Sequence, residues 1–194
     1  MVATSIDVPG YGRLSIAPDA NAPLLVVFGG IDVGSVPSGQ YMWNYMNALQ
    51  DRFHIFVAQS NIVNGPHAYH ALLKTVEEKG LTPSGQILYL FSGGYGPGMG
   101  VLAGRGVTQF SAIYLVDIWM GVTKKAGSWV PDFYRTLADH NAAKMTYVYT
   151  TFGANNEKAR DHIAKKLSPR STLVTGKGMD VHMSTYSVVV RMLL

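Results

Sequence analysis

The feature that most constrains the fold is a regular alternation of short apolar runs with helix-forming segments from residue 24 onward. Leu24–Phe28 is an unbroken apolar run, which is typical of a strand buried on both faces. Further strands are predicted at 53–58, 86–91, 112–116, 145–150 and 171–175, with helices between them and a last helix at 183–194. This alternation predicts a mostly parallel sheet with helices on both faces.

An antiparallel hairpin is predicted ahead of the parallel strands. Residues 2–8 and 11–17 alternate in polarity around the turn sequence Pro9-Gly10-Tyr11-Gly12. With the hairpin, the sheet has about eight strands, so the fold class is α/β. The 194 residues contain no repeat or low-complexity linker, and we therefore expect one domain over residues 1–194.

Composition excludes several classes of protein. Hydrophobic residues make up 47% of the chain and charged residues 14%, against about 25% charged in an average domain, so a folded core is expected rather than disorder. The absence of cysteine excludes disulfides, thiolate nucleophiles and cysteine-ligated zinc. No apolar run reaches the roughly 18 residues of a membrane helix and no signal-peptide pattern is visible, which predicts a cytoplasmic protein without a membrane partner.

Basic side chains gather in the last third of the chain, including Lys158, Arg160, Lys165 and Lys166. We interpret them as the solvated outer face of one helix, because no aromatic-interleaved basic stripe or nucleic-acid motif accompanies them. A nucleic-acid partner is therefore not expected.

Glycine-rich turns follow two of the predicted strands. Gly29 and Gly30 follow the first parallel strand, and the cluster Ser92-Gly93-Gly94-Tyr95-Gly96-Pro97-Gly98 follows the third. A hairpin, alternating strands and helices, and glycines at these points resemble the α/β-hydrolase fold superfamily, over about residues 2–194 and without room for a lid domain. The resemblance implies esterase or acyl-hydrolase chemistry. It also implies a Gly-x-Ser-x-Gly turn after the fifth strand, an acid after the sixth or seventh, and a histidine after the eighth.

The resemblance assigns most of these roles to residues at strand ends. Gly29 and Gly30 stand at the oxyanion position, where a backbone N–H must face a developing negative charge. His182, expected between the last strand and the last helix, stands where the superfamily keeps its general base. Asp117 is a candidate acid after the sixth strand. Asn155 and Asn156 occupy the alternative acid position after the seventh, where either could instead cap the next helix.

The nucleophile position admits two registers. If Ser92 is the nucleophile, Leu90 takes a position that should be small, and Pro97 falls inside the following helix at a cost of roughly 3 kcal/mol. If Gly94 occupies the nucleophile position, Ser92 and Gly96 are the small residues two positions before and after it, and Pro97 falls in the first turn of the helix. The second register agrees better with the need for small neighbours and with the position of proline in a helix. It predicts that glycine occupies the nucleophile position, so that no acyl-enzyme forms.

Several functions stay open on this fold. In one, Ser92, His182 and Asp117 hydrolyse a small ester or thioester, with Gly30 and Gly93 donating to the oxyanion. In a second, Gly94 marks a lost nucleophile and the protein is a non-catalytic binding or structural protein, with a protein partner or as a homo-oligomer. In a third, His182 acts as a base without covalent chemistry.

No cofactor or metal is predicted. His67 and His70 lie three residues apart on one predicted helix, but no third ligand has motif spacing. Gly98, Gly100 and Ala103 match an alanine form of the dinucleotide motif, although they begin too late after the strand. A flavodoxin-like sheet that binds a nucleotide or phosphate is the alternative on this evidence.

Overall fold

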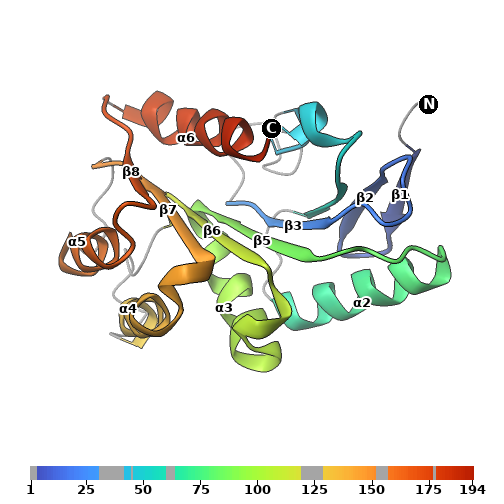
Figure 1. Cartoon of the computed structure of the whole chain (residues 1–194), viewed down its shortest axis with the longest axis horizontal. Helices are drawn as coiled ribbons and strands as arrows, with labels where there is room; N and C mark the ends of the chain where they lie inside the picture. Colours follow the sequence, from blue (N-terminus) through green and yellow to red (C-terminus); the bar gives the residue numbers. More distant parts are fainter. Residues whose placement is uncertain are drawn as a thin grey trace.

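In the computed structural model, which describes residues 4–30, 42–44, 46–59, 64–118, 129–151, 157–176 and 178–194, eight strands form one sheet (Figure 1). The strands are β1 (Thr4–Val8), β2 (Gly12–Ile16), β3 (Leu24–Phe28), β4 (His54–Ala58), β5 (Gln86–Phe91), β6 (Ala112–Val116), β7 (Met145–Tyr149) and β8 (Ser171–Leu173). The α-helices are α2 (Gly65–Glu78), α3 (Tyr95–Arg105), α4 (Trp129–Asn141), α5 (Glu157–Lys166) and α6 (Gly178–Leu193). Short 3-10 turns are η1 (Asn47–Leu49), η2 (Ser92–Gly94), η3 (Val107–Gln109) and η4 (Ala142–Lys144).

The strand order is β1-β2-β4-β3-β5-β6-β7-β8. The first two strands form the predicted antiparallel hairpin, and β2 also pairs antiparallel with β4. From β4 to β8 every pair is parallel. The predicted fold class is therefore confirmed. The flavodoxin-like alternative is wrong, because a flavodoxin-like sheet has the strand order 2-1-3-4-5 and not this eight-stranded order with an antiparallel hairpin.

Helices cover both faces of the sheet (Figure 1). The residues of β3 alternate between two cores, since all five are buried and consecutive side chains point to opposite faces. Leu24 and Val26 belong to the same buried apolar cluster as residues of α2, α3, α4 and α5, whereas Leu25 and Val27 belong to the cluster that includes residues of α6 and the segment around η1. The two apolar layers explain why the parallel strands read as continuous apolar runs.

None of the helices in the described ranges combines the length and apolar content that crossing a membrane requires.

Most predicted strand boundaries coincide with the observed ones and the others differ by one or two residues, but the start of the last helix differs more. We predicted a helix at 183–194 after a loop, whereas α6 begins at Gly178. Gly178 has a φ of 71°, which lets the chain turn into the helix. Asp180 then lies in the first turn, where its charge complements the helix dipole. The histidine that was expected in a loop therefore lies on a helix.

The N-terminal ends of α2 and α3 pack closely together. Asn64 caps α2, and its side-chain Oδ1 accepts from the backbone N–H of His67 at 3.2 Å. Gly65, the first residue of α2, lies against the backbone of Pro97 in α3, so a Cβ at Gly65 would come within 2.1 Å of the Pro97 carbonyl oxygen. Because that oxygen belongs to the backbone, it cannot move aside without shifting α3.

We predict that Gly65→Ala lowers the free energy of unfolding by about 1–3 kcal/mol, because the added methyl group overpacks the α2–α3 contact. Gly104→Ala in α3 is the matched control, since no atom lies within 4 Å of its added Cβ. That control should raise stability by up to about 1 kcal/mol through helix propensity. Urea unfolding of the three proteins measures the difference, and equal stabilities would refute the close approach.

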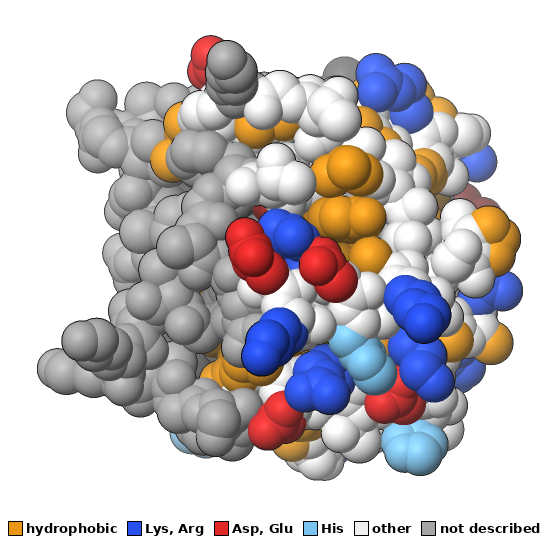
Figure 2. Space-filling view, turned by 90° about the vertical axis from the view of Figure 1, so that its left-hand side faces the viewer, with side chains coloured by type: hydrophobic (Ala, Val, Ile, Leu, Met, Phe, Trp, Pro, Cys, Tyr) orange, Lys and Arg blue, Asp and Glu red, His pale blue; other side chains and the backbone are white. Residues whose placement is uncertain are grey.

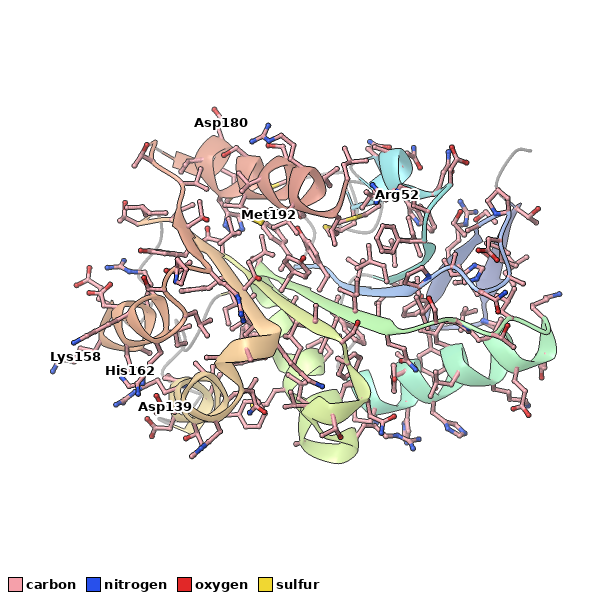
Figure 3. All side chains as sticks on the ribbon, in the orientation of Figure 1. Arg52, Asp139, Lys158, His162, Asp180 and Met192 are labelled. Atoms are coloured by element: carbon pink, nitrogen blue, oxygen red, sulfur yellow. The ribbon has the colours of Figure 1, made fainter. Side chains whose placement is uncertain are left out.

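A charged cluster links α4 to α5 on the surface. Asp139 of α4 accepts from His162 Nε2 at 2.9 Å and contacts Lys166 Nζ at 3.3 Å, both on α5 (Figure 3). The hydrogen bond from His162 is the main reason that the pKa of Asp139 lies below its usual value. Figure 2 shows acidic and basic side chains mixed on this face, which agrees with a solvated helix surface.

We predict that Asp139→Asn destabilises the protein slightly at neutral pH and not in strong acid. The lowered pKa means that the native state favours the ionised carboxylate, so its contribution is complete above the ordinary aspartate value. It is lost as the pH falls through the lower native value. Urea unfolding at pH 7 and below pH 3.8, the unperturbed pKa of the group, should therefore show a difference that shrinks in acid. A difference that stays constant with pH would contradict the linkage.

Candidate active site

Two polar residues stand at the carboxyl ends of neighbouring strands. Ser92 directly follows β5 and Asp117 directly follows β6, and the register pairs Phe91 with Val116 just before them. Both residues have left-handed backbones, with φ of 50° at Ser92 and 42° at Asp117. A non-glycine residue in this region is strained, and such strain clusters at functional sites. The edge formed by these two turns is therefore the candidate site.

The strained position of the turn after β5 is Ser92 and not Gly94. Gly94 has φ −62° and ψ −8°, an ordinary helical conformation that any residue adopts. The strained backbone is therefore at Ser92, whereas Gly94, the residue that we predict for the nucleophile position, has an ordinary one. The objection that Pro97 would lie inside the helix assumes that the helix starts directly after Ser92. Instead, Ser92–Gly94 forms a 3-10 turn, and α3 begins at Tyr95. Pro97 is then only the third residue of α3, where its missing N–H breaks no helical hydrogen bond.

Gly94 instead allows the turn after β5 to lie close to the end of β3. A Cβ at this position would lie 2.1 Å from the Phe28 carbonyl oxygen at the end of β3. Gly94 is thus the small residue two positions after Ser92. A Gly94→Ser substitution would clash with the β3 backbone rather than supply a usable hydroxyl.

Leu90, two positions before Ser92, is a bulky residue where the superfamily motif has a small one. Its buried side chain occupies the space beside Gly98 in α3, where an added Cβ would come within 2.2 Å of Leu90 Cδ2. The missing side chain of Gly98 therefore makes room for the side chain of Leu90. This exchange of size removes the objection to Ser92 in the first register.

A buried histidine–carboxylate pair lies at the same edge. His182 Nδ1 is 2.5 Å from Asp117 Oδ2, and the two side chains are 3% and 1% exposed. An ionised carboxylate only accepts hydrogen bonds, so beside ionised Asp117 the proton of a neutral imidazole is on Nδ1 and the lone pair is on Nε2. This arrangement suits a histidine that accepts a proton through Nε2.

His182 is held beside the turn after β5 by aromatic packing. The ring of Phe91, the residue before Ser92, lies 4.6 Å from the His182 ring, measured between centroids. Phe91 also packs on Tyr186, one turn further along α6, at 4.1 Å. Asp180, two residues before His182, is exposed on the outside of α6 (Figure 3). The partner of His182 in the described residues is therefore Asp117 and not Asp180.

The turn after β3 lies directly over Ser92. A Cβ at buried Gly30 would be 2.9 Å from Ser92 Cβ, 3.0 Å from its Oγ and 3.5 Å from the backbone nitrogen of Gly93. A side chain at Gly30 would collide with Ser92 at this distance, so the turn after β3 passes close to Ser92 and to the backbone of Gly93.

The other predicted elbow residues lie in α3. The Tyr95 carbonyl accepts from the Tyr134 hydroxyl of α4 at 2.6 Å, which ties the start of α3 to its neighbour. Gly96 faces open space. The alternative acid positions Asn155 and Asn156 lie outside the described residues.

One residue of the site was missed by the sequence reasoning. Thr150 directly follows β7, and its backbone N–H and its hydroxyl donate to the two oxygens of Asp117 at 2.9 and 2.8 Å. The available signal was its place at the end of a parallel strand beside β6. The sequence pattern alone places Thr150 as the last residue of that strand.

The described residues contain no group of three or more histidine, aspartate or glutamate side chains that could hold a metal ion. His67 and His70 lie on the exposed side of α2, and the His67 ring bonds to Asn64 at 2.8 Å. Gly98 and Gly100 lie inside α3 rather than in a loop, so they do not form a phosphate-binding turn.

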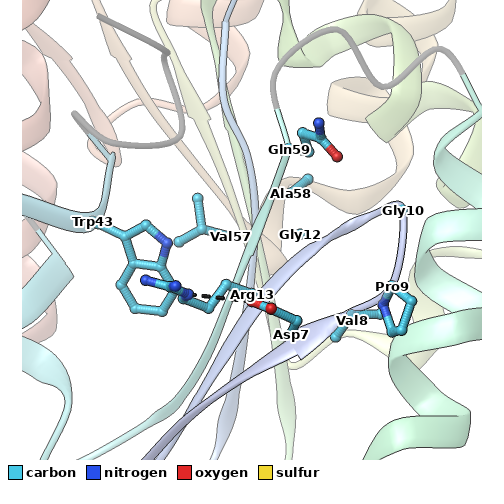
Figure 4. A pocket seen from close by; sticks show the side chains of 10 residues that line it. All are labelled: Asp7, Val8, Pro9, Gly10, Gly12, Arg13, Trp43, Val57, Ala58 and Gln59. Carbon is cyan, nitrogen blue, oxygen red and sulfur yellow. Dashed lines mark ion pairs between the residues drawn. The ribbon is translucent and has the colours of Figure 1, made fainter.

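A separate hollow of about 420 Å³ lies at the hairpin end of the sheet (Figure 4). Arg13 and Asp7, which form an ion pair at 3.5 Å, line it together with Trp43 and Gln59. None of Ser92, Asp117 and His182 lines this hollow, so it is distinct from the candidate site.

Comparison with known proteins gives a fold and no close relative. No protein-family model and no curated protein matches the chain. Among solved structures, the thioesterase domain from the curacin biosynthetic pathway matches with a TM-score of 0.60 and 9% identity, over 100% of this chain and 98% of that one. An esterase domain from a Rhodothermus marinus protein matches with 0.61 and 9%, over 98% and 97%. Esterase 2 of Thermogutta terrifontis, phosphoramylated by tabun, matches with 0.57 and 12%, over 97% and 95%. Together with the strand order, these likenesses show that the chain has the α/β-hydrolase fold.

Proposed function

We propose that the protein is a serine hydrolase that cleaves a small ester or thioester through an acyl-enzyme on Ser92. The observation that carries the proposal is the strained left-handed backbone of Ser92 beside the buried His182–Asp117 pair. Strain of this kind lifts a serine hydroxyl out of the turn between strand and helix. The esterase and thioesterase folds that the chain resembles support the same chemistry.

The roles follow from the chemistry of the three side chains. Ser92 Oγ attacks the acyl carbon while His182 Nε2 takes the hydroxyl proton. The N–H groups of Gly30 and Gly93 receive the oxyanion. The C–O or C–S bond then breaks, and His182 returns the proton to the departing alcohol or thiol. Water attacks the acyl-enzyme with the same base, which releases the acid and restores Ser92.

Asp117 has an electrostatic role in this sequence. Its carboxylate holds the Nδ1 proton of His182 and stabilises the imidazolium that forms when Nε2 takes the serine proton. Because both groups are buried, their attraction is less screened than it would be at the surface.

We predict that Ser92→Ala abolishes hydrolysis of p-nitrophenyl acetate and labelling by a fluorophosphonate probe, since both need the serine hydroxyl. Ser187→Ala is the matched control, because Ser187 is half-buried on α6 and its hydroxyl bonds only to the Ser184 carbonyl among the described contacts. The control should keep the wild-type rate. A wild-type protein that neither turns over esters nor takes the label would favour a non-catalytic binding protein instead.

We predict that Gly30→Ala lowers kcat by about 100-fold or more, because the added methyl group pushes the backbone N–H of residue 30 away from the oxyanion, and losing one oxyanion donor usually costs this much. The added Cβ would meet Ser92 Cβ and Oγ at 2.9 and 3.0 Å, so the two turns would separate. Gly104→Ala, which meets nothing within 4 Å, is the control. Steady-state kinetics with p-nitrophenyl acetate measure the effect, and an unchanged kcat would remove Gly30 from the oxyanion site.

A further inference from the structure

Thr150 makes an unusual double contact with the carboxylate of Asp117. Its backbone N–H donates to Oδ1 at 2.9 Å and its hydroxyl donates to Oδ2 at 2.8 Å. Oδ2 also accepts from His182 Nδ1 at 2.5 Å. Thr150 therefore holds both oxygens of the group that holds the histidine.

The carboxylate depends on these donors because it is almost completely buried. Asp117 and Thr150 are each 1% exposed, and a buried charge without hydrogen bonds is strongly disfavoured. The backbone N–H of Asp117 donates to the Val148 carbonyl at 2.7 Å, which fixes the backbone of Asp117 relative to β7. The two donors of Thr150 then fix the plane of the carboxylate, because one donor binds each oxygen.

We propose that Thr150 is a positioning residue of the hydrolytic site, which orients the Asp117 carboxylate so that its Oδ2 faces His182 Nδ1. This inference rests on the proposed function. In the fold superfamily the acid stands after the sixth or the seventh strand. Here the acid follows β6, and the residue at the end of β7 acts on the site by holding that acid.

The hydroxyl is the part of Thr150 that mutation can remove without changing the backbone. Thr150→Val replaces it by a methyl group of similar size, and Thr150→Ser keeps the hydroxyl and loses the methyl group. Thr146→Val is the matched control, because Thr146 is a half-buried threonine on the same strand. It pairs with Tyr114, far from the carboxyl ends of the strands.

Hydrolysis of p-nitrophenyl acetate gives the first readout. Thr150→Val should lower kcat by about 10- to 100-fold with little change in KM, since a hydrogen bond to a charged group is lost. Thr150→Ser should recover kcat to within a few-fold of wild type, and Thr146→Val should equal wild type. Thr150→Ala should show the same loss and serves if the valine variant does not fold. A wild-type kcat in the folded Val or Ala variant, or no recovery with Ser, would overturn the proposal.

Proton NMR of the His182 Nδ1–H gives a second readout that does not need activity. A proton shared with a nearby carboxylate resonates far downfield, so the signal should be present in wild type, Thr150→Ser and Thr146→Val. It should move upfield or vanish in Thr150→Val. An unchanged signal in Thr150→Val would overturn the positioning role. Recorded in the Ser92→Ala background, this readout separates failure of the Thr150 role from failure of the proposed function, which the serine variant tests by itself.

Discussion

The candidate site depends on how closely the turn after β5 approaches the turn after β3. Gly94 lies where any side chain would strike the Phe28 carbonyl, and Gly30 lies where any side chain would strike Ser92. Two backbones can approach to this distance only if both contact points lack a Cβ. The approach brings Gly30 close to the Ser92 side chain and Gly94 close to the end of β3.

The same edge also carries strain, and the surrounding structure offsets it. The left-handed backbones of Ser92 and Asp117 each cost on the order of 1–3 kcal/mol. Ser92 begins η2, which leads without interruption into α3, and the packing of α3 against the sheet restrains the turn. Asp117 is restrained by its backbone bond to Val148 and by the contacts of its carboxylate with Thr150 and His182. The strain thus persists because neighbours on several elements determine both conformations.

The fold, and the placement of Ser92, Asp117 and His182 at one edge of the sheet, could be predicted from the sequence because parallel strands end at a common edge. Ser92 and Asp117 each follow a run of apolar residues, and His182 follows the last strand, so the topology alone brings them together. The predictions that were less accurate concern positions whose environment is set by residues outside the local motif. Whether Leu90 is tolerated before Ser92 is decided by Gly98 on the next helix, and spacing rules for a motif do not include that contact.

The role of Thr150 and the start of α6 were missed for a related reason. A threonine at the end of a run of aromatic and β-branched residues is predicted as part of the strand, and only the pairing of β6 with β7 brings it to a carboxylate 33 residues earlier. Gly178 reads as a loop residue, but its positive φ begins a helix. In both cases the residue type was informative, while its partner was set by tertiary structure.

The exchange of volume between Leu90 and Gly98 has a consequence for how such chains are recognised. A sequence pattern that demands a small residue two positions before the serine passes over any chain that places the small residue on the facing helix instead. The two positions form one steric unit, so they should vary together during evolution, with a larger residue at one accompanied by a smaller residue at the other. Divergence of the nucleophile motif in this fold can therefore leave the turn itself unchanged.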